Sequence, residues 1–291
     1  MNRYQDRFIQ VVQYIEANLD EPINTNTLCD LVGLSKYHFH RQCSIFFGMS
    51  VMAFVKLLKL KRASYQLTYR SDMKVIDIAL ASGYDSHEAF SRAFKKYFSQ
   101  SPSEFRGAPN WGPWRSKYEP IIKLRTQIMD KKVFFDVEIT DFPKTLVAVM
   151  EHRGSPILLN KVLSSFIQWR RENSLPPHKS KTFNLIYDDP ALTDAENYRF
   201  DVCCAIENPV EENNYGVINK TIPAGLCAKI RHVGSDDAIG AAVRYLYSTW
   251  IRQSNYELRD FPIFFERVSF FPDVLESDMI TDVYLPIESP C

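Results

Sequence analysis

The sequence predicts a multidomain protein: an all-α domain with two helix-turn-helix motifs is followed by an α+β domain of two duplicated βαββ units. Two internal repeats carry this prediction. Residues 39–54 recur 51 positions later, and residues 142–155 recur 80 positions later. Apolar residues follow a helical period in the first repeat and a strand period in the second, so the repeats belong to different domains.

Length and composition fit two domains of ordinary size, since the chain has 291 residues and is 45% hydrophobic. The sequence near Met1 does not resemble an export signal, and no run approaches the roughly 20 apolar residues of a membrane span, so we expect a cytoplasmic protein. The cysteines form no CxxC pair and lack histidines at ligand spacing. We therefore expect buried thiols, no metal and no cofactor. These cysteines are Cys29, Cys43, Cys203, Cys204, Cys227 and Cys291.

The formal net charge of zero hides an asymmetry along the chain. Residues 1–107 carry a net +4, residues 108–132 another +4, and residues 133–291 carry −8. A basic front half favours a polyanionic partner, and an acidic back half favours cations.

The front half contains two helix-turn-helix patterns. In the first, a helical run that ends before Pro22 is followed by a short helix, a break at Gly33 and a third helix that Ser35 can cap. This third helix turns Phe39, Cys43 and Phe46 inward and Tyr37, His40 and Arg41 outward.

The second pattern places Gly83 before a helix with Phe90, Phe94 and Tyr97 inward and Arg92 outward, at the position that Arg41 holds in the first. Arginine suits this position because its planar fork can bond guanine O6 and N7 together or hold a phosphate. Lys95 and Lys96 extend the basic edge. Between the motifs, a helix that starts after Ser50 predicts a rigid spacer, which would let both recognition helices enter successive major grooves about 34 Å apart.

Residues 5–107 resemble the DNA-binding domain of the AraC/XylS transcription regulators. The resemblance rests on GLSKYHFHRQCSIFFGMSVMAFVKLLKLKRA and on IDIALASGYDSHEAFSRAFKKYFSQSPSEFR. It implies promoter DNA and RNA polymerase as partners, and it places Tyr37, His40 and Arg41, then Glu88, Ala89 and Arg92, at base edges. For the two arginines the alternative is a solvated helix face. Tyr37 and His40 could instead touch a sugar, a phosphate or nothing.

Residues 108–132 are rich in Pro, Gly and basic residues, which is typical of a connector between domains. The sequence does not say which domain Trp111 and Trp114 pack against.

In the back half, each copy is predicted to form a strand, a helix and two strands; in the first copy these are residues 144–151, 159–172, 182–187 and 200–206. The copies differ where the first has Leu185 and the second has Glu266. Strand alternation sets Glu266 on the same face as Phe264. A carboxylate in apolar surroundings must be protonated, paired, or exposed in a cleft that takes a cation. Aromatic side chains would complete such a site by stacking and cation–π attraction, and the candidates are Trp169, Tyr187, Trp250, Phe264 and Tyr284.

Residues 133–288 resemble the GyrI-like effector-binding domain through YDDP, YRFDVC, IPAG, FFER and TDVYLPI. The resemblance implies a small amphipathic or cationic ligand, and it matches the family's central glutamate with Glu266, for which an internal salt bridge is the alternative role. His152 and His232, present in both copies, indicate a shared turn. We place the GyrI-like domain at residues 133–291.

The domain order is similar to the Rob-type architecture. We therefore expect a transcriptional activator without enzymatic activity, controlled by an effector. A protein-docking module without a ligand, or a hydrolase of reactive natural products, are the alternatives for the back half.

Overall fold

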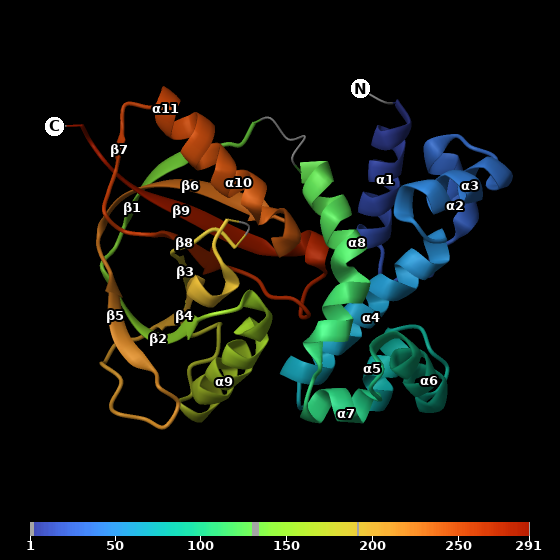
Figure 1. The fold of residues 1–291 in the computed structure, drawn as a ribbon, viewed down its shortest axis with the longest axis horizontal. Coiled ribbons are helices and arrows are strands. Elements are labelled where there is room, and N and C mark those ends of the chain that lie inside the picture. The colour runs from blue at the N-terminus through green and yellow to red at the C-terminus, as the bar shows by residue number, and fades with distance from the viewer. Residues whose placement is uncertain (1–2, 130–133, 191, 291) are drawn as a thin grey trace. The chain divides into compact units, whose positions relative to one another are not determined.

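The computed structural model describes residues 3–129, 134–190 and 192–290, which form two compact units (Figure 1). The helical unit contains the chain up to residue 131 together with Phe271–Met279. The sheet unit contains residues 132–270 and 280–291. Cys291 and the end of the expected connector, residues 130–132, lie outside the described residues.

The helical unit holds both predicted helix-turn-helix motifs, at opposite ends of α4 (Figure 1). Ser35, Ser50 and Ser86 cap α3, α4 and α6 as hydrogen-bond acceptors. Gly33 and Gly83 have φ values of 62° and 81°, a left-handed conformation that glycine adopts without strain. The helices are α1 (Arg3–Ala17), α2 (Thr25–Val32), α3 (Lys36–Phe47), α4 (Val51–Tyr69), α5 (Val75–Ala81), α6 (His87–Phe98), α7 (Pro102–Gly107) and α8 (Trp111–Met129).

Equivalent aromatic residues of the two motifs form the core of this unit. Phe39 and its counterpart Phe90 are fully buried, as are Cys43 and Phe94. The most buried ring at the end of α3 is Phe47 rather than the expected Phe46, and its counterpart Phe98 has the same role in α6. The repeat predicted from sequence is therefore a repeat of core packing.

Residues 111–129, which we expected to connect the domains, form α8 and belong to the helical unit. Trp114, Tyr118 and Ile121 of α8 lie in the hydrophobic core, and Trp111 packs against it. The Trp114 indole N–H donates to the Ser64 hydroxyl over 2.8 Å, which satisfies a buried polar group on each side. The segment forms a helix with one buried face although it is rich in Gly, Pro and basic residues. This composition is the reason that we expected a connector.

The sheet unit is a curled antiparallel sheet in the order β1-β6-β9-β8-β3-β4-β2-β5, with β7 beside β9. Both predicted βαββ units are present, each preceded by a strand that we did not predict, β1 or β5. Because β1 pairs with β6 and β5 with β2, each copy adds its first strand to the other copy. The strands are β1 (Glu138–Phe142), β2 (Thr145–Arg153), β3 (Thr182–Ile186), β4 (Arg199–Ala205), β5 (Ile218–Ile222), β6 (Gly225–Val233), β7 (Glu257–Leu258), β8 (Ile263–Arg267) and β9 (Ile280–Glu288).

The two copies differ in their helices by one inserted residue. In the first copy α9 (Leu159–Glu172) is a regular α-helix. In the second copy α10 (Ile239–Tyr245) continues into a π-helical segment, Leu246–Trp250, and then α11 (Ile251–Gln253). A single π turn absorbs one extra residue in a helix, so it accounts for the change in spacing from 80 to 81 residues between the copies.

The helices cover one face of the sheet, and the other face carries the aromatic residues around Glu266. Ala148, Val202, Ala228 and Val283 face the helices, whereas Phe183, Phe264 and Tyr284 lie on the opposite face. Within the described residues no single helix is long and apolar enough to cross a membrane; only α3 and α4 taken together, bent by 50°, reach that length and hydropathy.

Candidate functional site

Glu266 lies on the helix-free face of the central strand β8, directly opposite Phe183 of β3 and Asp282 of β9. Its side chain is only 11% exposed. One carboxylate oxygen lies 2.8 Å from the Lys181 ammonium, and the other accepts from the Tyr284 hydroxyl over 3.3 Å. The Lys181 side chain is 68% exposed, so it pairs with Glu266 from the solvent side. The carboxylate is thus paired with a group that can leave without disturbing the core.

A cavity of about 190 Å³ opens over Glu266. This volume is smaller than the roughly 300–1,000 Å³ of sites for drug-sized ligands, and it suits a single ring with one head group. Two carboxylates and one ammonium give the lining a net charge of −1. The lining residues are Thr140, Asp141, Phe142, Pro143, Thr145, Lys181, Phe183, Glu266 and Tyr284.

Aromatic rings form part of the cavity wall and pack against one another in the core behind it. Tyr284 stacks on the buried Phe264 with ring centroids 5.0 Å apart and planes inclined by 9°. Phe142 meets Tyr284 edge-on at 5.3 Å and Phe264 edge-on at 4.8 Å. Such ring pairs hold their geometry, so the Tyr284 ring is fixed with its hydroxyl directed at Glu266.

Glu266 and its neighbour Asp282 are paired with different cations, Lys181 and Arg231. Arg231 neutralises Asp282 with two hydrogen bonds of 2.7 Å. These hydrogen bonds, followed by the charge of Asp282, raise the pKa of Arg231. Burial, then the charges of Glu266 and Asp282, raise the pKa of Tyr284, which therefore remains a protonated donor. A positive charge placed in the cavity would be repelled mainly by the Lys181 ammonium.

The predicted ligand residues fall in three places. Glu266 and Tyr284 line the cavity together, and Phe264 lies behind Tyr284 in the core. Trp169 and Trp250 belong to the clusters on the helix-covered face: Trp169 is buried beside Phe166, and Trp250 stacks on Tyr256. The structure therefore does not bring the two tryptophans to the cavity, because an inward helical position is also an ordinary core position.

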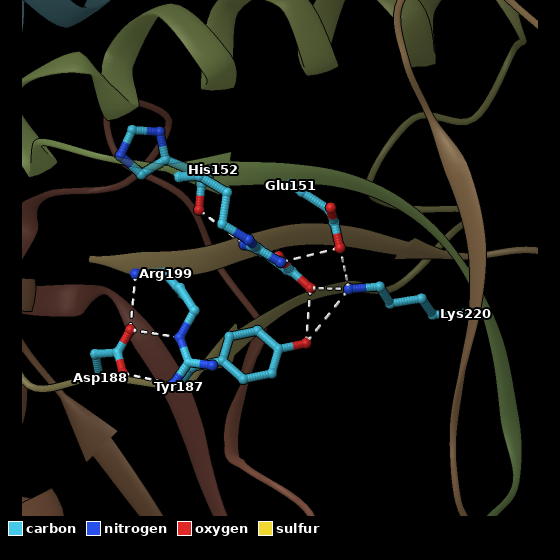
Figure 2. Close-up of polar contacts among 8 residues, drawn as sticks. Glu151, His152, Tyr187, Asp188, Arg199 and Lys220 are labelled. Atoms are coloured by element: carbon cyan, nitrogen blue, oxygen red, sulfur yellow. Dashed lines mark hydrogen bonds and ion pairs between the residues drawn. The ribbon is translucent and has the colours of Figure 1, made fainter. Parts of the chain in front are cut away.

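Tyr187 takes part in a separate polar network on the first copy (Figure 2). Its hydroxyl donates to the fully buried Asp201 over 2.8 Å, and Lys220 bonds Asp201 over 2.6 Å and Glu151 over 2.5 Å. The Arg199 guanidinium lies over the Tyr187 ring and pairs with Asp188 at 2.8 Å. Burial, followed by its own hydrogen bond to Asp201 and the charge of Asp201, raises the pKa of Tyr187 to about 12. Each carboxylate here already has a cationic partner.

Of the lining residues, sequence reasoning named only Glu266 and Tyr284; Lys181, Phe142 and Phe183 are among those that it missed. Phe183 is the counterpart of Phe264 in the duplication, and Phe142 opens the duplicated segment, so the sequence held a signal for both rings. For Lys181 there was none, since its position depends on the register that pairs β3 with β8. The two repeated histidines do share a turn: His152 and His232 each contact the carbonyl of the serine three residues later, at 3.1 and 3.0 Å.

The described cysteines are buried free thiols, Cys29, Cys43, Cys203, Cys204 and Cys227. Burial raises the pKa of Cys43 to about 12 and that of Cys227 to about 11, which keeps them protonated at neutral pH. Within the described ranges no cluster of His, Cys, Asp and Glu could hold a metal ion.

In the helical unit, the predicted DNA-reading residues lie on the outer faces of α3 and α6. Tyr37 is 72% exposed, and His40, Arg41 and Arg92 are also exposed. Lys95 and Lys96 are exposed in the last turn of α6. Ala89 is half-buried near the start of that helix. The exposed Glu88 beside it has a lowered pKa, because its own backbone N–H and the Ser86 hydroxyl bond its carboxylate.

Comparison with known proteins agrees with this layout. Residues 135–288 match the family of GyrI-like small molecule binding domains, and residues 28–108 match a helix-turn-helix domain family. The probable transcriptional regulator YgiV of Escherichia coli (strain K12) is 41% identical over 153 residues, which cover 52% of this chain and 96% of YgiV.

Two further matches cover other shares of the chain. The right origin-binding protein of Escherichia coli (strain K12) is 29% identical over 127 residues, 44% of this chain and 43% of that protein. A cryo-EM structure of the EcmrR–DNA complex aligns over 91% of this chain and 99% of EcmrR, with 14% identity and a TM-score of 0.45.

An AraC-type helix-turn-helix domain followed by a small-molecule-binding domain defines a DNA-binding transcriptional regulator. The chain belongs to the family of GyrI-like proteins through its sheet unit, and its helical unit is of the AraC type.

Proposed function

We propose that this regulator is an activator that acts in the cytoplasm and is controlled by a small aromatic cation bound at Glu266. The observation that carries the proposal is the placement of Glu266. It is a nearly buried carboxylate at the floor of an aromatic cavity, and its cationic partner Lys181 is mostly exposed. A ligand cation that takes the place of the Lys181 ammonium would gain the same charge pairing together with contacts to Phe142, Phe183 and Tyr284.

The ligand class follows from the shape and charge of the cavity. The net charge of −1 favours a monocation, and the small volume favours one aromatic ring with a compact cationic group. Benzyltrimethylammonium has this chemistry, and N,N-dimethylbenzamide is a neutral molecule of similar size. The pair separates the contribution of charge from that of ring burial.

For the helical unit, we propose that α3 and α6 enter the major groove of promoter DNA. Tyr37, His40 and Arg41 would then meet one half of the site and Glu88, Ala89 and Arg92 the other, with Lys95 and Lys96 on phosphates. The exposure of the charged residues and the equivalence of Arg41 and Arg92 support this assignment. The activator role and the contact with RNA polymerase rest on the AraC/XylS resemblance alone.

Isothermal titration of the full-length protein with benzyltrimethylammonium tests the ligand site. We expect saturable binding by the wild type and by Glu257→Gln, a matched substitution of an exposed carboxylate on β7, and at least tenfold weaker binding by Glu266→Gln. Equal binding by all three proteins, or no binding by the wild type, would remove Glu266 as the effector site. Chemical conversion of the bound cation would instead favour an enzyme.

A further inference from the structure

The loop between β8 and β9 belongs to the helical unit, although both of its flanking strands belong to the sheet unit. Residues 271–279, here termed the arm, begin four residues after the end of β8 and finish immediately before β9. At its base, the backbone N–H groups of Val268 and Ser269 donate to the Ile280 carbonyl over 3.0 and 3.2 Å. The arm is therefore the closed tip of the β8–β9 hairpin.

The arm carries an acidic residue into a basic socket of the helical unit. The Glu276 carboxylate lies 2.5 Å from the Lys61 ammonium of α4 and 2.8 Å from the Arg125 guanidinium of α8. Arg125 also bonds Glu16 of α1 over 2.9 Å. The side chains of Lys61, Arg125 and Glu276 are only 6%, 5% and 12% exposed, so water screens these charges weakly.

The charges of this network depend on one another. Burial by itself raises the pKa of Glu276, but the charges and hydrogen bonds of Lys61 and Arg125 outweigh burial and lower it to about 2. Burial raises the pKa of Glu16, because the charge of Arg125 only partly compensates. Glu276 is thus the carboxylate that the socket holds most firmly in its charged form.

Other contacts fix the arm along its length. The Phe271 ring meets Tyr65 of α4 edge-on at 4.9 Å, and Leu275 packs against the helical core. Arg70, at the end of α4, bonds the Asp273 carboxylate through its Nε at 2.6 Å. Arg62 donates to the Pro272 carbonyl over 3.4 Å. The arm thereby reaches α4, the helix that joins the two helix-turn-helix motifs, at several points.

Among its described residues, the matching loop in the first copy lacks these features. It has the same length, residues 187–198 against 268–279, but Ala195 stands where the arm has Glu276. Its Asp188 pairs with Arg199 of its own hairpin, and Glu196 is exposed. Docking is therefore a property of one copy, the same copy that carries Glu266.

We infer that the arm is a built-in part of the DNA-binding unit and that it links the effector cavity to α4. The hairpin holds two cavity residues, Glu266 on β8 and Tyr284 on β9, and its tip holds Glu276. A ligand that changes the hairpin changes the free energy of arm docking, and by linkage a change in the arm alters ligand affinity by the same factor. The docking of the arm stands on its own contacts, whereas the link to the ligand rests on the function proposed above.

Hydrogen exchange of the full-length protein, without ligand or DNA, tests the docking. We expect Glu276→Gln to speed exchange in α4, α8 and residues 271–279 at least tenfold, since Lys61 and Arg125 both lose the charge of Glu276. Asp273→Asn, at a more exposed pair, should have a smaller effect in the same segments. Glu196→Gln in the matching loop should leave them unchanged. Unchanged exchange in Glu276→Gln would overturn the inference.

Benzyltrimethylammonium then tests the link. At saturation it should change exchange in residues 271–279 and α4 of the wild type at least threefold, and its affinity for Glu276→Gln should differ at least threefold from the wild-type value. Binding that leaves the helical unit unchanged, with equal affinity for both proteins, would overturn the link while the docking stands. No binding by the wild type would overturn the proposed function and the link together, and the first measurement would still decide the docking.

Discussion

Both halves of this chain are duplications, but they have diverged in opposite ways. In the helical unit the outward arginine is kept in both copies, as Arg41 and Arg92. In the sheet unit the inward carboxylate exists in one copy only, as Glu266 against Leu185. Two equivalent arginines suit the proposed contacts with DNA, because successive major grooves repeat along the duplex. A single small ligand, as proposed above, would need only one cavity, so the other copy would not need a carboxylate at the position of Leu185.

The duplication gives the sheet unit a second position equivalent to the cavity, and side chains occupy that position. The Arg259 guanidinium lies so close to Gly225, the counterpart of Thr145, that a Cβ there would displace it, and it donates to the Ala224 carbonyl. Phe261 packs against Phe264, the counterpart of Phe183. These side chains lie where the cavity would be expected from the repeat. The two copies thus share a framework and differ in what stands on it.

The largest difference between the copies should appear in their loops. We expect Glu276→Ala to lower the free energy of unfolding of the helical unit by about 3–5 kcal/mol, because both buried cations lose the Glu276 carboxylate and Arg125 is left with Glu16. Glu196→Ala in the matching loop should change it by less than about 0.5 kcal/mol. Urea unfolding followed by tryptophan fluorescence measures both. Equal effects of the two substitutions would mean that the loops are equivalent after all.

The next difference concerns the ligand. Glu266→Gln should weaken binding of benzyltrimethylammonium by about 1.5–3 kcal/mol, the usual contribution of a hydrogen bond or contact to a charged group. Calorimetric titration gives the value directly. An unchanged dissociation constant would show that the carboxylate in the second copy is only a part of the framework.

In the helical unit, the two copies should behave alike. Arg41→Ala and Arg92→Ala should each cost about 1–3 kcal/mol of affinity for a duplex selected by the wild-type protein from a random library. Lys95→Ala should weaken all duplexes similarly and reduce the salt slope by about 1, from a wild-type slope near −5 for about six phosphate contacts. Gel-shift titrations over a range of salt concentrations measure these effects. If only one arginine matters, the motifs are not equivalent readers.

A smaller effect is expected at the rim of the cavity. Lys181→Met removes the ammonium that competes with a ligand cation for Glu266, so the affinity for benzyltrimethylammonium should rise by about twofold to fivefold, the range of an exposed ion pair. Lys179→Met, at an exposed lysine two residues away, is the control. Weaker binding by Lys181→Met would assign Lys181 to the ligand rather than to its exclusion.

The dependence of stability on pH tests the pairing of Glu276 by a second route. The pKa of Glu276 is lowered to about 2 in the folded protein from an ordinary value of 4.5. Its stabilising contribution is therefore fully present above about pH 4.5 and declines as the pH falls toward 2. The raised pKa of Glu16 acts in the opposite direction, so its protonation favours the folded state. The difference in unfolding free energy between the wild type and Glu276→Gln should therefore shrink on acidification; a constant difference would contradict the assigned pairing.

Sequence reasoning reached the parts of this architecture that depend on local patterns. The serine caps at positions 35 and 50, the inward Phe39 and Phe90 and the strand face shared by Phe264 and Glu266 all follow from spacing over a few residues. The exchanged strands β1 and β5 were missed because they are short and gain their partners only from the other copy. Lys181 was missed for the same reason, since long-range register brings it to Glu266.

The arm was beyond reach of the sequence for a different reason. Nothing local in residues 271–279 indicates that they pack against the helices, and nothing local shows that Lys61 and Arg125 are buried around Glu276. Lys61 and Arg125 come together around Glu276 only in the folded helical unit.

The central claim is that the ligand's charge and the Glu266 charge recognise each other, and a thermodynamic cycle measures this directly. The dissociation constants of benzyltrimethylammonium and of N,N-dimethylbenzamide are determined for the wild type and for Glu266→Gln. We predict a coupling free energy of about 1.5–3 kcal/mol, with the neutral amide bound almost equally by both proteins. A coupling of zero would contradict the account, because the cavity would then recognise a ring and not a cation.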